Sequence, residues 1–104
     1  MYYIYMLRCE DNSIYTGITT NIEKRMKEHF NKDKNCAKYT LSHVAMNLEI
    51  VWETETKQLA SKLEYHIKTL KKNQKEELIK NSVLLEKFLG NKIESNKYRK
   101  KLDA

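Results

Sequence analysis

Short runs of strand-forming residues at the start and in the middle of the chain predict three β-strands. Residues 2–8 and 14–18 are rich in Tyr, Ile and Leu, and the polar residues 10–13 between them are typical of a turn. Leu48, Ile50 and Trp52 alternate with their neighbours and form a third run. The chain is therefore expected to open with a hairpin and to add one strand after a polar stretch.

Three stretches show the periodicity of amphipathic helices, at residues 22–30, 56–70 and 74–89. The first follows a Thr-x-x-Glu sequence at residues 20–23, a pattern typical of a helix N-terminus. Ser82 is a candidate break in the third stretch. The order ββα, β, αα predicts a small α+β domain in which a three-stranded antiparallel sheet is flanked by helices.

The length of 104 residues favours one domain, which we place at residues 1–90. The net charge of +6 suggests a polyanionic partner, and nucleic acid is the commonest one. Residues 91–104 hold five Lys or Arg against two Asp or Glu, a net of +3, so half of the charge lies in this basic C-terminal tail. The tail is either a solubilising end or a sequence-independent grip on phosphate.

Several classes of protein are disfavoured by the sequence. Its apolar runs are a few residues long, far short of the roughly 20 residues that span a bilayer. The start of the chain has no cationic segment before an apolar one, so no signal peptide is predicted. Cys9 and Cys36 are not spaced as metal ligands and are interpreted as reduced thiols. We therefore expect a cytoplasmic protein without a membrane association or a structural zinc site.

The predicted hairpin carries two tyrosines, Tyr5 and Tyr15, as candidate catalytic residues. A three-residue loop would pair Tyr5 with Gly17 and place both hydroxyls on one face of the sheet. Gly17, which has no side chain, would then leave space beside them. A two-residue loop would send the tyrosines to opposite faces. The alternative is that both are ordinary core residues of the strands.

Arg25 and His29 are one turn apart on the first predicted helix, at the edge of its apolar stripe. A guanidinium offers a permanent charge and a bidentate fork, and an imidazole offers a titratable nitrogen. Together they are suited to contact one phosphate. An incidental Arg-x-x-x-His on an ordinary amphipathic helix is the alternative.

Glu64 lies at the edge of the apolar stripe of the second predicted helix, with the small Ala60 one turn earlier. One carboxylate there is suited to a single Mg²⁺ or Mn²⁺ ion, which keeps several waters and binds substrate phosphate. The alternative is a solvated carboxylate that pairs with Lys68.

Further candidate nucleic-acid-binding residues combine positive charge with one aromatic ring, a combination suited to gripping a backbone and stacking on a base. They are Lys32, Lys34, Lys38 and Tyr39 in the polar loop, and Lys97, Arg99, Lys100 and Lys101 in the tail. A solvated loop is the alternative for the first group.

Taken together, these motifs resemble the GIY-YIG nuclease superfamily. Tyr-Ile-Tyr at residues 3–5 stands where that family has Gly-Ile-Tyr, and Tyr-Thr-Gly at 15–17 stands where it has Tyr-Ile-Gly. Arg25-x-x-x-His29 and Glu64 match the family's later motifs in order and spacing. The resemblance covers about residues 2–80 and is greatest to the small stand-alone bacterial YhbQ-like members.

The resemblance implies a divalent-metal-dependent endonuclease that hydrolyses DNA phosphodiester bonds, with a structure-selective role in repair or processing. It implies that Tyr5, Tyr15, Arg25, His29 and Glu64 form the catalytic site and that Glu64 holds one Mg²⁺ or Mn²⁺. RNA stays open as a substrate, and a protein partner is a candidate source of substrate specificity. Two other interpretations stay open: a non-catalytic nucleic-acid-binding module on the same fold, and an adaptor with a vestigial site.

Two features depart from the family pattern. Tyr3 replaces the first glycine of the motif. Many members also carry a late active-site asparagine, for which Asn73 and Asn81 are candidates, and that role is left unassigned.

Overall fold

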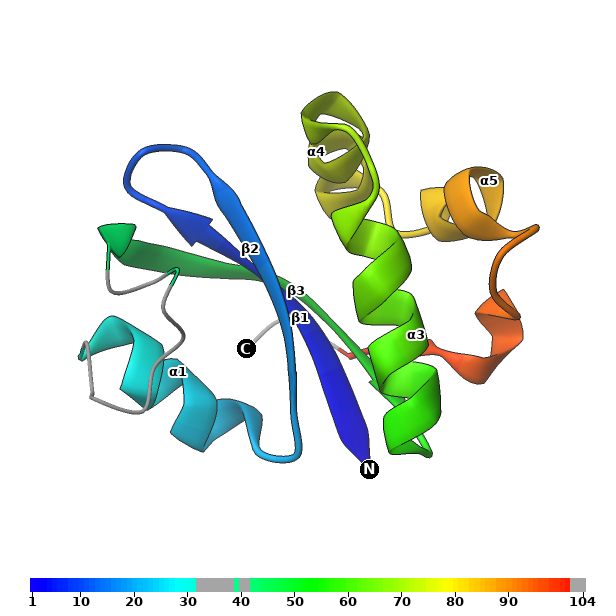
Figure 1. Cartoon of the computed structure of the whole chain (residues 1–104), viewed down its shortest axis with the longest axis horizontal. Helices are drawn as coiled ribbons and strands as arrows, with labels where there is room; N and C mark the ends of the chain where they lie inside the picture. Colours follow the sequence, from blue (N-terminus) through cyan, green and yellow to red (C-terminus); the bar gives the residue numbers. More distant parts are fainter. Residues whose placement is uncertain (32–38, 40–41, 102–104) are drawn as a thin grey trace.

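The computed structural model describes residues 1–31, 39 and 42–101, which form a four-stranded sheet with helices on both faces (Figure 1). The elements along the chain are β1 (Tyr2–Cys9), β2 (Ile14–Thr19), α1 (Ile22–Phe30), β3 (Ala45–Thr54), α3 (Lys57–Lys68), α4 (Lys72–Lys80), α5 (Leu84–Leu89), the 3-10 helix η1 (Ser95–Lys97) and β4 (Arg99–Lys101). In this described part of the chain, no helix combines the length and the apolar character that crossing a bilayer would need.

The α+β class is confirmed, but the prediction of three strands is wrong, because the sheet has four. All neighbouring strands are antiparallel, in the order β2-β1-β3-β4. The additional strand, β4, consists of Arg99, Lys100 and Lys101 and pairs with residues 51–53 of β3. Three consecutive basic residues have no apolar alternation, so only backbone pairing with β3 marks them as a strand.

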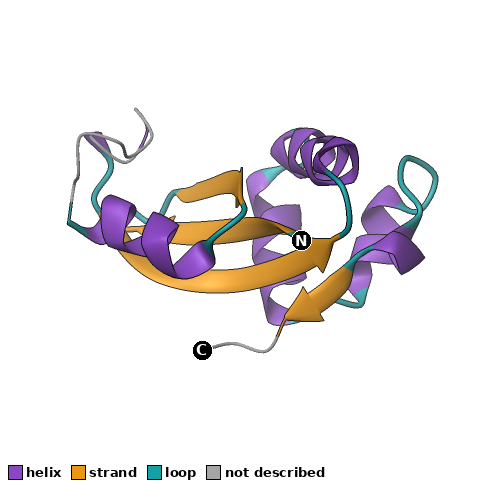
Figure 2. Cartoon of the chain, turned by 90° about the horizontal axis from the view of Figure 1, so that it is seen from below, coloured by secondary structure: helices purple, strands orange, loops and turns teal. Residues whose placement is uncertain are grey.

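Alternation along the central strands divides their side chains between two faces. Ile4 and Met6 of β1 point to the face covered by α3, α4 and α5, whereas Tyr5 and Leu7 point to the face covered by α1. Figure 2 shows α1 on one side of the sheet and the later helices on the other. The same two strands therefore supply both a large core and a second, smaller cluster.

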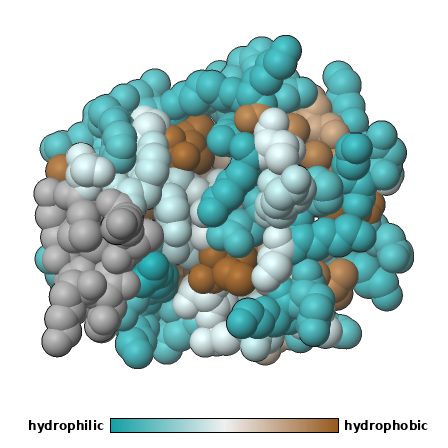
Figure 3. Space-filling view, viewed as in Figure 1, coloured by the Kyte–Doolittle hydropathy of each residue, from teal (hydrophilic) through white to brown (hydrophobic). Residues whose placement is uncertain are grey.

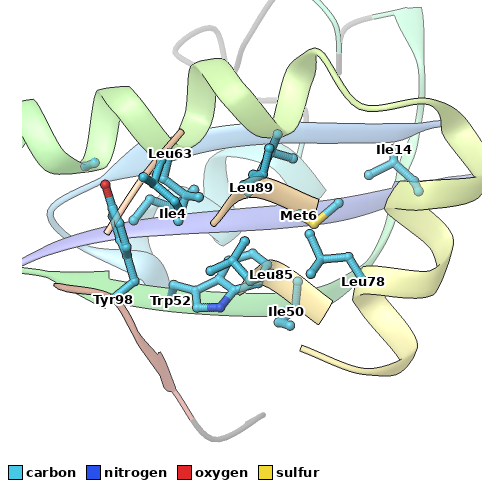
Figure 4. Packing of buried hydrophobic residues seen from close by; sticks show 13 residues of the cluster. Ile4, Met6, Ile14, Ile50, Trp52, Leu63, Leu78, Leu85, Leu89 and Tyr98 are labelled. Atoms are coloured by element: carbon cyan, nitrogen blue, oxygen red, sulfur yellow. The ribbon is translucent and has the colours of Figure 1, made fainter. Parts of the chain in front are cut away.

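The larger core lies under α3, α4 and α5 (Figure 4). Leu63 of α3 and Trp52 of β3 are among its fully or almost fully buried members. Residues beyond position 90 also belong to it, since Ile93 and Tyr98 are buried and the Tyr98 hydroxyl donates to the Leu59 carbonyl at 2.7 Å. The first part of the segment that sequence sets apart as a tail thus packs against the domain.

The predicted helices are present with small changes at their ends. The first helix starts after Asn21, whose side chain accepts from the Lys24 amide at 3.0 Å, rather than after Thr20. The third predicted helix is divided at residues 81–83 into α4 and α5, where Ser82 suggests a break. Phe30, the apolar residue at the end of α1, is 42% exposed.

Candidate active site

The turn between β1 and β2 fixes the register of the hairpin. The Cys9 amide donates to the Ser13 carbonyl and the Asn12 amide to the Cys9 carbonyl, each at 2.9 Å, which closes a three-residue loop. Asn12 has φ 70°, in the left-handed region that Asn tolerates better than most residues, and the Asp11 carboxylate accepts from the Ser13 amide at 3.0 Å. Of the two loops that sequence left open, the three-residue one is therefore correct.

This register places Tyr5 opposite Gly17 and Tyr15 opposite Leu7, so the two tyrosines share a face. Their ring centroids are 6.1 Å apart. A Cβ added to Gly17 would lie 2.6 Å from the Tyr5 hydroxyl and 2.9 Å from a Tyr15 ring carbon. Only glycine at this position allows the Tyr5 ring to lie across β2 beside Tyr15.

Helix α1 adds Arg25 and His29 to the two tyrosines. The Tyr5 hydroxyl is 2.7 Å from His29 Nε2, and Arg25 Nε donates to the same hydroxyl at 3.4 Å. Because a guanidinium can only donate, the Tyr5 oxygen accepts from Arg25. The Tyr5 hydroxyl donates to His29 Nε2 in the imidazole tautomer that carries its proton on Nδ1. The His29 ring centroid is 5.6 Å from those of both Tyr5 and Tyr15. We call these four side chains the tyrosine cluster.

Burial sets the protonation states within the cluster. His29 is fully buried, and this burial, with the nearby positive charge of Arg25, lowers its pKa to about 4. Burial also raises the pKa of the Tyr5 phenol well above its ordinary value, although the Arg25 hydrogen bond opposes the shift. At neutral pH the pair is therefore an un-ionised phenol hydrogen-bonded to a neutral imidazole.

The guanidinium of Arg25 contacts Glu28 through one nitrogen and the Tyr5 hydroxyl through another. Its Nη1 lies 2.8 Å from Glu28 Oε1, one turn along α1, while its Nε contacts the Tyr5 hydroxyl. Both side chains of the ion pair are largely buried, at 21% and 15% exposure, so the guanidinium is fixed next to the phenol. A fixed Arg beside a polarised hydroxyl is suited to binding one phosphate group.

Glu64 comes from α3, on the other face of the sheet, and is linked to the tyrosine cluster through Lys68. Lys68 Nζ is 3.2 Å from Glu64 Oε2 and 5.6 Å from the Tyr15 ring centroid. Because β2 is an edge strand, groups on opposite faces of the sheet approach one another around it. The pairing with Lys68 that sequence left open for Glu64 is thus formed.

Glu64 is the carboxylate that would coordinate a divalent cation at this site. No group of three His, Cys, Asp or Glu side chains suited to a metal ion occurs among the described residues. Glu64 alone fits Mg²⁺ or Mn²⁺ better than a cation that needs a complete protein cage, because Mg²⁺ retains waters and takes phosphate oxygens as ligands. The donor set is therefore compatible with the predicted ion.

A stack of aromatic rings continues outward from the cluster. Tyr39 stacks on Tyr15 with centroids 5.5 Å apart and on His43 at 4.1 Å. His43 Nδ1 is 2.5 Å from the Asp11 carboxylate, whose pKa is lowered to about 2 by hydrogen bonds from Ser13 and then His43. Tyr39 was expected to stack on a base, whereas His43 and Asp11 carried no sequence signal. Lys32, Lys34 and Lys38 lie outside the described residues.

The remaining predicted nucleic-acid-binding residues are Lys97, Arg99, Lys100 and Lys101. They lie in or beside β4, at the edge of the sheet opposite β2, and are exposed. Arg99 is 2.6 Å from Glu53, and Lys101 Nζ is 5.0 Å from the Tyr3 ring centroid. Lys101 therefore reaches the α1 face, where Tyr3 packs against the apolar cluster that includes Tyr5, while β4 itself lies on the edge of the sheet away from β2.

An ion-pair network fastens α4 to the end of the hairpin. Arg8 donates to both carboxylate oxygens of Glu76, at 2.6 and 2.5 Å, and lies 3.1 Å from Glu49 of β3. This network lowers the pKa of Glu76 to about 2, mainly through the Arg8 hydrogen bonds. It fixes the start of α4 beside the turn that positions the tyrosines.

A family model described as the GIY-YIG catalytic domain matches residues 1–77. The chain therefore belongs to the GIY-YIG family.

Within the family, the chain is similar to proteins named UPF0213. It is 45% identical over 78 residues to UPF0213 protein FN1575 of Fusobacterium nucleatum, covering 75% of this chain and 76% of the relative. It is 34% identical over 89 residues to UPF0213 protein YhbQ of Salmonella arizonae, covering 86% and 87%. A solution NMR structure of UPF0213 protein BH0048 from Bacillus halodurans aligns at 37% identity, covers 77% of this chain and 84% of that one, and gives a TM-score of 0.49.

Proposed function

We propose that the protein is an endonuclease that hydrolyses DNA phosphodiester bonds with the help of one divalent cation. The main support is the tyrosine cluster, in which the Tyr5 hydroxyl contacts His29 Nε2 at 2.7 Å and Arg25 Nε at 3.4 Å. Membership of the GIY-YIG family supports a nuclease of this class. We assign it a structure-selective role in DNA repair or processing, with a protein partner as a source of substrate choice.

Arg25 is assigned to the scissile phosphate. Its planar fork binds a non-bridging oxygen and neutralises the charge that develops there during in-line attack by water. Glu28 keeps the guanidinium oriented through the 2.8 Å ion pair. Arg25 is thus a catalytic residue in this scheme, and Glu28 is a positioning residue.

Tyr5 is assigned to the attacking water. Its raised pKa makes a resting phenolate unfavourable, so it acts best as a relay rather than as a stored base. As its oxygen accepts a proton from the water, its own proton passes to His29 Nε2, which is neutral at pH 7 and accepts this hydrogen bond in the tautomer protonated on Nδ1. Tyr15 supports the ring positions and lines the site next to them.

Glu64 is the residue that would hold Mg²⁺ or Mn²⁺, with waters and phosphate oxygens completing the coordination. When bound, such an ion supplies Lewis-acid stabilisation of the leaving oxygen. Lys68 pairs with this carboxylate at 3.2 Å.

The test compares the wild type with Glu64→Gln, Tyr5→Phe and the control Glu77→Gln. Glu77 is exposed on α4, and its substitution removes the same charge outside the site. Each variant is assayed for binding and cleavage on duplex, nicked, branched and single-stranded DNA, and on RNA, with Mg²⁺, Mn²⁺ or chelator. We expect wild type and Glu77→Gln to cleave only with metal, and the two site variants to bind but not cleave.

Other outcomes identify the alternatives. A binding module would bind DNA equally with metal or chelator and would cleave nothing as wild type. A vestigial adaptor would neither cleave nor bind at physiological salt. Wild-type cleavage that persists unchanged in Glu64→Gln would reject the metal assignment.

A further inference from the structure

Three lysines meet at the corner where α3 passes into α4, beside the hairpin. Lys68 Nζ lies 5.6 Å from the Tyr15 ring centroid, and Lys72 Nζ donates to the Asn12 carbonyl in the hairpin turn. Lys75 follows Lys72 by three residues on α4, and the positive charges of Lys72 and Lys68 repel its ammonium. We call Lys68, Lys72 and Lys75 the lysine corner.

Lys75 is the unusual member of the corner. It is partly buried, and no carboxylate among the described residues pairs with it. Burial, followed by repulsion from Lys72 and Lys68, lowers its pKa. An ammonium kept near two like charges without a counter-ion of its own is stabilised by any anion that joins the three.

Two carboxylates contact the corner, Glu76 at Lys72 and Glu64 at Lys68, and neither forms an ion pair with Lys75 in the described part of the chain. Glu76 lies 3.4 Å from Lys72 but accepts two shorter hydrogen bonds, of 2.6 and 2.5 Å, from Arg8. Glu64 pairs with Lys68 at 3.2 Å and is also the residue proposed to bind the divalent cation.

We propose that the lysine corner binds a backbone phosphate of the nucleic acid, adjacent to the phosphate held by the tyrosine cluster. The ligand is the sugar–phosphate chain without regard to base sequence. The hydrophilic surface over α4 in Figure 3 is consistent with a polar ligand at this corner. The assignment rests on the proposed function and adds to it the direction in which the bound strand continues, from Tyr15 toward α4.

The experiment measures binding of a labelled DNA duplex by fluorescence anisotropy between 50 and 300 mM salt, with chelator to prevent cleavage. It compares the wild type with Lys75→Gln, Lys75→Arg and the control Lys80→Gln, an exposed lysine in the last turn of the same helix. We expect Lys75→Gln to weaken binding by about five- to tenfold at 100 mM salt and to reduce the slope of log K against log salt by about one. Lys75→Arg should keep the slope, and Lys80→Gln should change affinity less than about twofold. Equal effects of Lys75→Gln and Lys80→Gln would reject the site.

A second measurement does not depend on nuclease function. Inorganic phosphate is titrated into the wild type at low salt while the lysine side-chain resonances are followed by NMR. We expect a saturating change at Lys75 with a rise in its pKa, and no saturating change at Lys80. Identical responses at both lysines would overturn the assignment even if wild type cleaves DNA. A response confined to the lysine corner would support it even if wild type cleaves nothing.

Discussion

The two faces of the sheet use the same central strands for different purposes. Among the described residues, the face under α3, α4 and α5 buries thirteen apolar residues in one cluster, whereas the face under α1 buries four. The four are Tyr5, Leu7, Met26 and Val51. Beside them lies the fully buried His29, whose Nε2 contacts the Tyr5 hydroxyl. The smaller cluster therefore encloses a hydrogen-bonded imidazole and phenol, whereas the buried polar groups of the larger core are hydroxyls such as those of Thr16 and Tyr98.

This difference indicates how a domain of this size accommodates the polar groups of the proposed site. Buried apolar area provides most of the folding free energy, and it is concentrated on one face. The other face can then keep a neutral imidazole and a phenol away from water, at a cost that the larger core offsets. Because β1 contributes alternate side chains to both faces, a firm core on one side fixes Tyr5 on the other.

The largest expected effect comes from truncating one buried side chain on each face, which tests whether the larger core provides most of the stability. Leu63→Ala removes a fully buried side chain of the larger core and should lower the free energy of unfolding by about 2–5 kcal/mol. Met26→Ala, in the smaller cluster and 8% exposed, should cost about 2 kcal/mol or less. Urea denaturation measures both. Equal losses for the two variants would show that stability is shared between the faces.

The buried imidazole gives the α1 face a pH dependence that the apolar face lacks. The pKa of His29 is about 4 in the folded protein, below the roughly 6.5 of an unfolded chain. The unfolded state therefore binds the proton more readily, and the free energy of unfolding should fall by about 3 kcal/mol as the pH drops from about 6.5 to about 4.

Denaturation at a series of pH values checks this in wild type, His29→Gln and the control His66→Gln. His66 lies on α3, outside the cluster. His29→Gln should lose most of the slope between pH 6.5 and 4, and His66→Gln should keep it. A wild-type stability that stays constant over this interval would contradict a buried neutral imidazole.

The contact between the two tyrosines can be disturbed at Gly17. In Gly17→Ala the new methyl would lie 2.6 Å from the Tyr5 hydroxyl, so both rings must move. We expect a loss of stability of about 1–3 kcal/mol from overpacking and a fall in DNA cleavage of about 100-fold from misplaced groups. Thr19→Ala, at the partly exposed end of β2, is the control. Cleavage at the wild-type rate by Gly17→Ala would show that the tyrosine positions do not govern activity.

Local patterns predicted much of the fold and of the cluster. The turn-forming residues 10–13 indicated a hairpin, and alternation then placed Tyr5 and Tyr15 on one face once the loop length was known. Helical spacing placed Arg25 and His29 on one edge of α1. These features depend on residues close in sequence, which is why pattern alone is informative about them.

Features that depend on distant partners could not be predicted. The strand β4 exists because Arg99–Lys101 pair with β3, nearly fifty residues earlier, and its own composition favours no strand. Likewise, His43 reaches Asp11 and Lys72 reaches Asn12 only after the chain has folded. The lysine corner also lacks a motif, because one of its members comes from α3 and two from α4.

Substitutions of Thr16, which have the smallest expected effect on stability, test whether the larger core tolerates a buried hydroxyl without a hydrogen bond. Thr16 of β2 pairs with Met6, faces that core and is 2% exposed. Its hydroxyl oxygen is buried without a hydrogen-bond partner among the described residues.

Thr16→Val keeps the shape of the side chain and removes the unsatisfied group, so it should raise the free energy of unfolding by about 1 kcal/mol. Thr16→Ser keeps the hydroxyl, loses a methyl group and should lower it by about 1 kcal/mol. A clear destabilisation by Thr16→Val, measured by urea denaturation, would mean that a buried water satisfies the hydroxyl. The contrast between an apolar face and a polar one would then be weaker than the side-chain packing indicates.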